Sequence, residues 1–544
     1  MSGIAEHERN GAGPGKSPAC RRWLAALALP ALLWLGACAS TDGTAPGDAE
    51  AALDRDMFVT GFEDIQAVYI TPPDIPGMAV AGLQQLSALD PDISAKRVGD
   101  KIELLVKDQP VDTIDVNDGM DAKEWGETTA EMLDDARAES AKLRAVSDEK
   151  IYASMFSGVI GKLDAFSRYA SAEVAKENRA TRDGFGGIGV RISVEDNTVR
   201  VISVMHYTPA ERLGVKRDDI ITAIDGGSTE GLTQQDVVNK LRGPVDSRVT
   251  LTLKRENVAT PIDVTLSRAH VVPETVSYRR EGQIAYFRIY SFNSETTESL
   301  KREITDAQTE IGPRLTGYII DLRQNPGGLL NQAVSVSNLF LDEGRIVSTH
   351  GRHPDSHQYF EASDGDITKG KPIVALVDGN SASAAEIVAA ALQDNGRAVV
   401  VGSNSYGKGT VQTVLPMPNQ GEITLTWARF HAPSGYTLHH LGVLPSVCTV
   451  GEEDADQLVH DLMDGRMAQV PTAKRNATKP EDTKALDALR NTCPARQTEE
   501  AIDMEVAMKI LDKPDLFAEA IHLAQPPQVS ASDQPSDSQI PLQP

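Results

Sequence analysis

The spacing of hydrophobic residues divides the chain into stretches of different character. Residues 56–180 carry apolar side chains mostly at helical intervals, as in Ile151–Leu163, which predicts a helical N-terminal region. Residues 184–256 contain short β-branched runs between glycine turns, which predicts a β-rich module. In residues 275–450 strand-like runs alternate with helical ones, as in an α/β domain, and residues 451–523 return to a helical, charged pattern. A multidomain α/β protein is therefore expected.

The two ends of the chain lie outside these predicted domains. Basic residues, an apolar run of roughly 13 residues and small residues precede Cys38, which predicts a secretory signal at residues 1–37. The Leu-Gly-Ala sequence before this cysteine resembles the lipobox of bacterial lipoproteins. That resemblance implies a lipidated Cys38 that anchors the protein to a membrane, the outer rather than the inner one because Ala39 follows; an uncleaved signal anchor is the alternative. Residues 38–55 are predicted to be a tether and residues 524–544 a disordered tail.

Length, charge and cysteine content narrow the functional classes. A chain of 544 residues, 40% of them hydrophobic, is long enough for several domains. Its net charge of −25 and the lack of a basic stripe argue against a nucleic-acid partner. Cys448 and Cys493 remain once the signal is removed and Cys38 is lipidated. A disulfide between them is predicted in an oxidising compartment, and two unpaired buried thiols are the alternative.

Two glycine-rich segments look like nucleotide-binding motifs but lack the required context. Residues 184–189 match G-x-G-x-x-G, yet a strand follows where a dinucleotide site needs a helix. Residues 402–408 resemble a P-loop, yet Gly409 stands where Ser or Thr binds magnesium, and again a strand follows. No nucleotide, metal or other cofactor is therefore expected.

A serine after a buried-type strand is a candidate nucleophile. Residues 373–377 are apolar, a sharp turn follows, and Ser383 precedes a helical run. The amide of Ala384 is then a free donor at a helix N-terminus, and Gly328, in a second glycine-rich turn after a strand, offers another amide for an oxyanion. The sequence from Ser383 to Glu386 is also a capping box, which explains the serine without any chemistry.

A serine hydroxyl needs a base, because it is a weak nucleophile at neutral pH. Lys408, 25 positions after the candidate serine, lies between two glycines and before an apolar strand, which favours a desolvated amine with a lowered pKa. On a strand Gln412 shares a face with residue 408, so its amide oxygen can orient the lysine. A surface lysine in a glycine turn is the alternative. A Ser–His pair with His431, His439 or His440 is a second one, although none of these has comparable flanking sequence.

Several motifs in order resemble one protease family. The segments DLRQNPGG, NSASAAEIVAAALQDNGRAVVVG, SYGKGTVQT and ARFHAPSGYTLHHLGVLPSV are similar to those of the C-terminal processing peptidases, the tail-specific proteases of peptidase family S41. The likeness spans roughly residues 150–450. It implies an α/β Ser-Lys protease core of the crotonase/Clp-protease kind. The family's catalytic positions fall on Ser383 rather than Ser381 as nucleophile, Lys408 as base, Gln412 as its support, and Gly328 and Ala384 as oxyanion amides.

The β-rich module resembles a PDZ domain through four ordered motifs, of which the first is the loop Gly186-Gly187-Ile188-Gly189. Amides of this loop can hold a chain-terminal carboxylate while the adjacent strand pairs with an extended peptide. A generic β-rich module is the alternative. The resemblance implies protein or peptide substrates with exposed C-termini, and family members sometimes act with a lipoprotein adaptor.

Together with these residues, the resemblances imply a periplasm-facing serine endopeptidase that cleaves cell-envelope proteins near their C-termini. The intact set of Ser383, Lys408 and Gln412 favours this enzyme over two alternatives. A catalytically inactive PDZ scaffold of the envelope is the main alternative, and a purely structural lipoprotein is a weaker one.

Overall fold

The computed structural model describes residues 46–116, 119–363, 365–466 and 472–524. The predicted signal segment, the lipidation site Cys38 and all but the first residue of the predicted tail lie outside these ranges. Helix α1 (Pro46–Val68) begins inside the segment of residues 38–55 that was predicted to be a tether. The predicted tether is therefore too long at its C-terminal end. The alanines that suggested a loose tether are also the best helix formers. No helix in the described ranges is long and apolar enough to cross a membrane.

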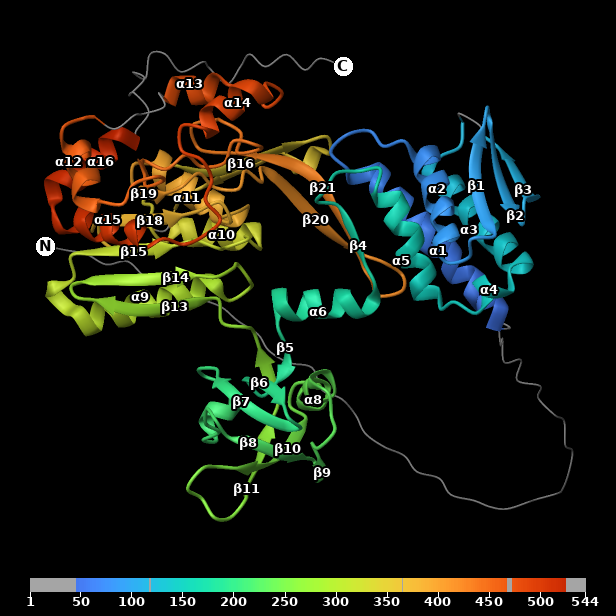
Figure 1. The fold of residues 1–544 in the computed structure, drawn as a ribbon, viewed down its shortest axis with the longest axis horizontal. Helices are drawn as coiled ribbons and strands as arrows, with labels where there is room; N and C mark the ends of the chain where they lie inside the picture. The colour runs from blue at the N-terminus through green and yellow to red at the C-terminus, as the bar shows by residue number, and fades with distance from the viewer. Residues whose placement is uncertain (1–45, 117–118, 364, 467–471, 525–544) are drawn as a thin grey trace, which may run out of the picture. The chain divides into compact units, whose positions relative to one another are not determined.

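The N-terminal module combines helices with a small antiparallel sheet (Figure 1). Its further elements are α2 (Ile75–Gln84), β1 (Ile93–Val98), β2 (Lys101–Val106), β3 (Gln109–Asp115), α3 (Ala122–Glu139), α4 (Ala141–Arg144) and α5 (Asp148–Ile160). Phe58, Trp125 and Phe156 lie fully buried in one hydrophobic core. The predicted, mostly helical region also contains a three-stranded antiparallel sheet at residues 93–115, which the hydrophobic pattern did not indicate. There Ile102 and Leu104 alternate with outward residues, and the short strands are too brief to outweigh the surrounding helical pattern.

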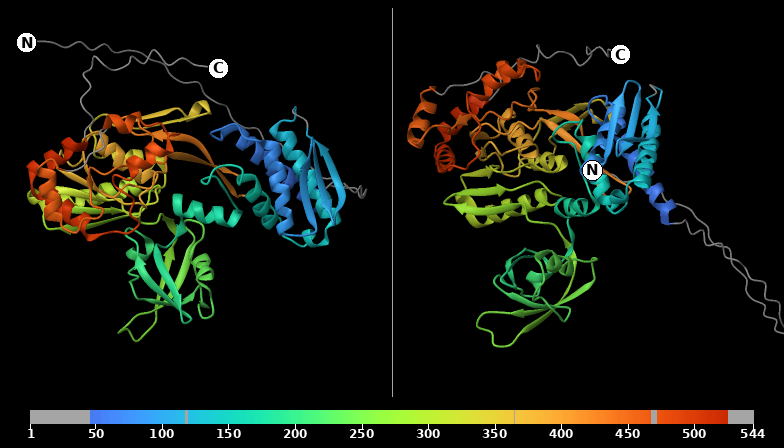
Figure 2. Two further views of the ribbon diagram at one scale, coloured as in Figure 1. Left: turned by 45° about the horizontal axis from the view of Figure 1, so that its top comes forward. Right: turned by 45° about the vertical axis from the view of Figure 1, so that its right-hand side comes forward.

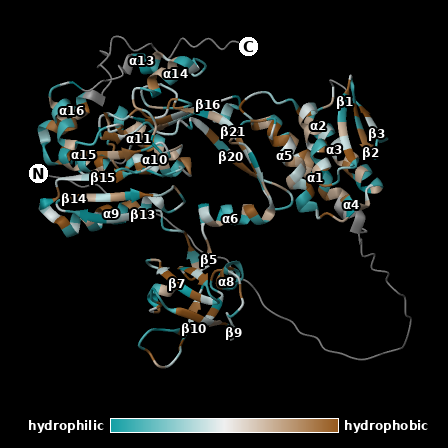
Figure 3. Ribbon diagram, in the orientation of Figure 1, coloured by the Kyte–Doolittle hydropathy of each residue, from teal (hydrophilic) through white to brown (hydrophobic). Residues whose placement is uncertain are grey.

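The β-rich module forms a sheet with strand order β11-β10-β8-β7-β6, and β9 pairs with β8. Its elements are β5 (Phe185–Gly187), β6 (Val190–Glu195), β7 (Thr198–Val204), α7 (Pro209–Arg212), β8 (Ile220–Ile224), β9 (Gly227–Ser228), α8 (Gln234–Leu241), β10 (Arg248–Lys254), β11 (Ile262–Ser267) and β12 (Ala269–Val271). Buried and outward residues alternate along β10, and Figure 3 shows hydrophobic and hydrophilic colours alternating in this module. Because β12 pairs with β5, the module extends past the predicted boundary at residue 256.

The core domain contains a six-stranded sheet with order β13-β14-β15-β18-β19-β22, parallel from β14 onwards. The strands are β13 (Val276–Glu281), β14 (Ile284–Ile289), β15 (Gly317–Asp321), β18 (Ile373–Val377), β19 (Val399–Gly402) and β22 (Val447–Cys448). Side chains of the four central strands, β14, β15, β18 and β19, alternate between two hydrophobic clusters. One cluster includes α9 (Thr296–Ile311), α10 (Leu330–Asn338) and α11 (Ala384–Asp394); the other includes α12 (Ala455–Met463), α15 (Ala501–Asp512) and α16 (Pro514–Ala524).

The helices after residue 450 are therefore part of the core domain. Val506 and Ile510 of α15 pack in the same cluster as Val374 and Leu376 of the central strand β18. Two shorter helices, α13 (Thr472–Ala477) and α14 (Thr483–Arg490), lie between α12 and α15 in the chain. Of the predicted separate region of residues 451–523, helices α12, α15 and α16 cover one face of the sheet, whereas Leu486 and Leu489 of α14 pack in the cluster on the other face.

A second sheet connects the core domain with the N-terminal module. Its strands are β4 (Arg168–Ala170), β16 (Arg345–Gly351), β17 (Gln358–Glu361), β20 (Thr410–Pro416) and β21 (Glu422–His431). At one end of the β20–β21 hairpin, Val411 and Phe430 belong to the core cluster, and at the other Met417 and Ile423 belong to the N-terminal cluster. Figure 2 shows β20 and β21 as two long orange strands. Helix α6 (Ala172–Asp183) follows β4.

Candidate active site

The turn between β18 and α11 gives Ser383 an unusual backbone. Its φ is 55° and its ψ is −114°, a region that non-glycine residues rarely adopt. Such strain at a strand-to-helix turn is the device that presents a nucleophile at the top of a sheet. Ser381, two residues earlier, is fully buried; its hydroxyl donates to the carbonyl of Leu322 at 2.8 Å and accepts from the amide of Asp378 at 2.9 Å. Ser381 is thus held as a structural residue, and Ser383 is the half-buried serine of the turn.

Two backbone amides beside Ser383 are unused. Among the described residues, neither the Gly328 amide nor the Ala384 amide has a hydrogen-bond acceptor, whereas the Gly327 amide donates to Asn325 Oδ1 at 2.8 Å. A Cβ on Gly327 would lie 2.8 Å from Ser383 Cβ, so the glycine turn passes directly against the serine. Gly328 has a φ of 147°, and a Cβ there would lie 2.1 Å from the carbonyl oxygen of Phe292. Only glycines allow this close approach.

Lys408 projects from a glycine turn on the other side of the site. Its half-buried side chain has Nζ 5.0 Å from the centroid of the Phe166 ring. Burial lowers the pKa of the Lys408 amine, and the positive charge of Arg168 lowers it further, while the carboxylates of Glu386 and Asp164 act in the opposite direction. A lysine that loses its proton more readily than usual is what a general base requires.

Glu386 joins the two turns. Its fully buried carboxylate accepts hydrogen bonds from the Ser383 amide at 2.7 Å, the Gly407 amide at 2.7 Å and the Lys408 amide at 3.0 Å. The hydroxyl of Ser405 donates to it as well. Burial raises the pKa of Glu386, and the four donors oppose that shift. The sequence suggested only a helix cap; the link to the lysine turn depends on a contact across 22 residues that no local pattern reveals.

Gln412 lies in the same site but does not contact Lys408 in this conformation. A β-bulge between Val411 and Gln412 interrupts the alternation of the strand. The Gln412 amide nitrogen donates to the hydroxyls of Thr410 at 2.9 Å and Thr426 at 3.1 Å. The predicted orientation of the lysine by this amide is therefore not formed here.

One cavity of about 460 Å³ brings the predicted catalytic residues together. Its lining includes Ser383, Ala384, Gly328, Lys408 and Gln412. None of the alternative histidines at positions 431, 439 and 440 lines it. Within the described part of the chain, the Ser383 hydroxyl and the Lys408 amine line the same cavity but form no hydrogen bond with each other. No metal-binding cluster of His, Cys, Asp or Glu occurs in the described ranges.

The PDZ-like module has its own groove of about 250 Å³ between β6 and α8. Gly187, Ile188 and Gly189 line this groove, together with apolar residues of the strand and helix. Gly186 does not line it; a Cβ at this position would lie 2.0 Å from the carbonyl oxygen of Gly243, so the residue is needed for packing. The groove has the form that an extended peptide with an apolar C-terminus fits.

An arginine connects this groove with helix α6. Arg242 lines the groove, its guanidinium lies 4.1 Å from the centroid of the Phe185 ring, and it donates to both carboxylate oxygens of Glu177 at 2.7 and 2.9 Å. Asn178 and Arg182 of the same helix line the catalytic cavity. The two cavities are thus connected through one ion pair and one helix.

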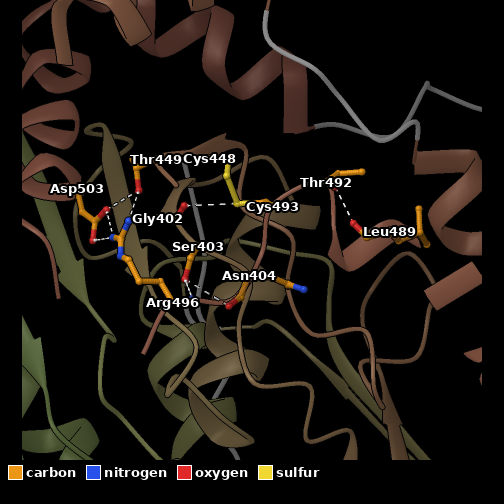
Figure 4. Close-up of a disulfide and its surroundings, with 10 residues drawn as sticks. All are labelled: Gly402, Ser403, Asn404, Cys448, Thr449, Leu489, Thr492, Cys493, Arg496 and Asp503. Carbon is orange, nitrogen blue, oxygen red and sulfur yellow. Dashed lines mark hydrogen bonds and ion pairs between the residues drawn. A yellow bond between two sulfur atoms is a disulfide. The ribbon is translucent and has the colours of Figure 1, made fainter. Parts of the chain in front are cut away.

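The C-terminal segment packs behind both catalytic turns. Cys448 and Cys493 form a disulfide (Figure 4). Arg496, three residues on, donates its amide to the Ser403 hydroxyl at 3.0 Å, and its side chain pairs with the fully buried Asp503. The Arg496 carbonyl accepts from the amide of Gly379, in the nucleophile turn, at 2.7 Å. Residues after the predicted catalytic core therefore help to hold the site.

This arrangement places in one cavity the kinds of group that a serine-type peptidase uses: a hydroxyl, an amine with a lowered pKa and two free backbone amides. Residues 283–448 match the model of peptidase family S41, and residues 178–254 match the PDZ domain model. The carboxy-terminal-processing protease of Bartonella bacilliformis is 42% identical over 302 residues, which cover 55% of this chain and 70% of that protein. Carboxy-terminal processing protease CtpA of Bacillus subtilis is 35% identical over 305 residues, 55% of this chain and 64% of that protein.

A solved structure of a photosystem II D1 C-terminal processing protease aligns over 72% of this chain and 92% of its own, with 21% sequence identity and a TM-score of 0.37. The chain belongs to the carboxy-terminal processing proteases of peptidase family S41, which are serine-type peptidases, and carries a PDZ domain.

Proposed function

We propose that this chain hydrolyses peptide bonds near the C-termini of cell-envelope proteins through Ser383 and Lys408. The Ser383 oxygen attacks the carbonyl carbon of the scissile bond while the neutral Lys408 amine takes the hydroxyl proton. The amides of Gly328 and Ala384 donate to the oxyanion. Lys408 then passes its proton to the leaving amine, and a water molecule, deprotonated by Lys408, releases the acyl group from the serine.

The backbone of Ser383 beside two unused amides is the observation that carries this proposal. A simple helix cap needs neither a positive φ nor free amides on both sides. The lowered pKa of Lys408 supports its role as base. Since the lysine and serine do not touch in this conformation, the reaction includes a rearrangement that brings Lys408 to Ser383 and turns Gln412 toward the lysine.

The wider assignment rests on the PDZ groove and the N-terminal sequence. We place the C-terminus of the substrate in the groove lined by Gly187 to Gly189, and the core in the crotonase/Clp-protease class. Lipidation of Cys38 anchors the protein to the outer membrane, facing the periplasm, where a lipoprotein adaptor joins it with its substrates. Mass spectrometry of the mature N-terminus tests this: an acylated residue 38 supports the assignment, and an intact segment of residues 1–37 refutes it.

Single substitutions test the chemistry. Ser383→Ala and Lys408→Ala should each abolish cleavage of an envelope extract by the purified protein, and the double variant should lose no more, because the two residues act as one unit. Lys408→Arg should also be inactive, since a guanidinium does not give up its proton near neutral pH. Ser381→Ala is the matched control: it leaves the nucleophile in place and should reduce stability more than chemistry. Undiminished new C-termini from Ser383→Ala would refute the mechanism, and a wild type that binds C-terminal peptides without cleaving them would favour a PDZ scaffold.

A further inference from the structure

The catalytic cavity has a charge opposite to that of the chain. The protein contains 78 Asp and Glu residues and has a net charge of −25, yet none of the Asp and Glu residues in the described ranges lines this cavity. Three cationic side chains do: Arg168, Arg182 and Lys408. A cleft lined by one sign of charge concentrates ligands of the other sign. The cavity therefore favours an anionic group, against the repulsion of the surrounding surface.

The two arginines of the cavity are not equivalent. Arg182 is already neutralised, because it pairs with Asp183 at 3.0 Å and with the buried Glu422 at 3.3 Å. Arg168 has no ion pair or hydrogen bond with any residue in the described ranges, and its side chain is exposed to the cavity. The amide of Asn178, also on the cavity wall, likewise lacks a partner among the described residues. Both unused donors line the same cavity.

The backbone fixes Arg168 at this position. Strand β4 pairs with β21 so that Arg168 lies opposite Thr424, and Thr424 in turn lies opposite Val414 of β20. Thr424 and Val414 both line the cavity. A guanidinium held in this way presents several N–H donors in a planar fork that matches the geometry of a carboxylate. Its positive charge also acts on Lys408, whose pKa it lowers.

We propose that Arg168, assisted by Asn178, forms a subsite for a carboxylate of the bound peptide, so that the enzyme prefers an acidic side chain close to the scissile bond. This inference rests on the proposed peptidase function. It adds a consequence for the base: a bound carboxylate offsets the charge of Arg168, and Lys408 then holds its proton more tightly. Acidic and neutral substrates should therefore differ in the acid limb of their pH profiles.

A panel of peptides in which one Asp is moved across the cleavage site, each with a matched Asn peptide, tests the subsite. At one position the wild type should show a kcat/KM about three- to tenfold higher for Asp than for Asn, the range expected of a partly exposed charge-assisted pair. Arg168→Gln should bring this ratio to about one, and Arg168→Lys should retain part of it. Arg179→Gln is the matched control, because Arg179 pairs with Glu422 outside the cavity.

Two further arms make the result decisive. Each peptide is also made with an amidated C-terminus; if the preference for acid disappears with the terminal carboxylate rather than with Asp, the internal acidic side chain is not what Arg168 binds. If the ratio of kcat/KM for Asp over Asn peptides were the same in the wild type and in Arg168→Gln, the proposal would be wrong and Arg168 would be only a solvated surface cation. Binding of the same peptides to Ser383→Ala, with and without Arg168→Gln, is measured by fluorescence anisotropy. The ratio of the dissociation constants of the Asn and Asp peptides reports on the subsite even if no peptide is cleaved. Failure of the subsite and failure of the peptidase function are therefore distinguishable.

Discussion

Replacing Glu386 by Gln is the sharpest test of how the two catalytic turns are held together. One carboxylate oxygen accepts from the amides of Ser383 and Lys408, and the other accepts from the amide of Gly407 and the hydroxyl of Ser405. A glutamine keeps the shape but has only one accepting oxygen. Its NH₂ group must face one of these two pairs of donors.

The contacts determine which orientation costs less. Ser405 Oγ already accepts from the amide of Val443 at 2.7 Å and can also accept from an NH₂ group once its own hydroxyl turns away. The amide of Gly407 has no such freedom. The favoured orientation therefore leaves one buried N–H without an acceptor, which costs about 1–3 kcal/mol of unfolding free energy. Glu386→Ala removes the acceptor for all four donors and should cost about 3–6 kcal/mol.

Activity should fall with stability but for a separate reason. With the Gly407 amide released, the lysine turn shifts relative to Ser383, and displacements of this kind lower kcat by about tenfold or more. Denaturant unfolding measures the first effect, and hydrolysis of a fluorogenic peptide under conditions where the variant remains folded measures the second. If Glu386→Gln matched the wild type in both, the carboxylate would not couple the turns. Ser381→Ala serves as the control, because it should destabilise the turn that carries Ser383 while leaving the hydrogen bonds of Glu386 to both turns in place.

Three further outcomes are expected. Replacing Cys493 with Ser removes the disulfide to Cys448, which closes a loop with a sequence separation of 45 residues, and should lower the free energy of unfolding by about 2–4 kcal/mol. An unchanged urea midpoint would contradict this. An uncleavable peptide with a free apolar C-terminus, bound in the PDZ groove, should activate hydrolysis of a separate small substrate. Arg242→Gln, which breaks the ion pair with Glu177, should abolish this activation. If the peptide left the turnover of the small substrate unchanged in the wild type, the PDZ groove would only hold substrate near the site. The kcat/KM should rise with pH as Lys408 loses its proton, with a midpoint below that of a free lysine; a profile that is flat from neutral to alkaline pH argues against this base.

Local sequence pattern indicated candidates for the chemistry without deciding between them. An apolar strand, a sharp turn and a helix start made Ser383 a candidate nucleophile beside the capping-box alternative, and the family resemblance chose it over Ser381. Two glycines around Lys408 indicated a desolvated amine. The positive φ of Ser383 and the two unused amides are three-dimensional properties consistent with that prediction. The order of strands in the core sheet brings these segments together.

Other parts of the site could not be read from the sequence. Gln412 was assigned to the lysine's strand face by simple alternation, which a β-bulge cancels. Arg168 enters the cavity only because β4 pairs with β21, more than 250 residues away in the chain. Arg496 contacts the nucleophile turn through hydrogen bonds that depend on how the C-terminal helices pack on the sheet. These features depend on how distant segments pair and pack, and no periodic pattern of residues in the sequence indicates them.

The β20–β21 hairpin has a consequence for how the N-terminal module bears on the proposed site. Lys408 directly precedes β20, and Val411 near the start of this strand packs in the core cluster that includes Ala384 of α11. Met417, next to the far end of the strand, is buried in the N-terminal core. One strand therefore belongs to both hydrophobic cores and begins beside the proposed base. A substitution that loosens the N-terminal core would reach the lysine turn along this strand, although it lies in another module of the chain.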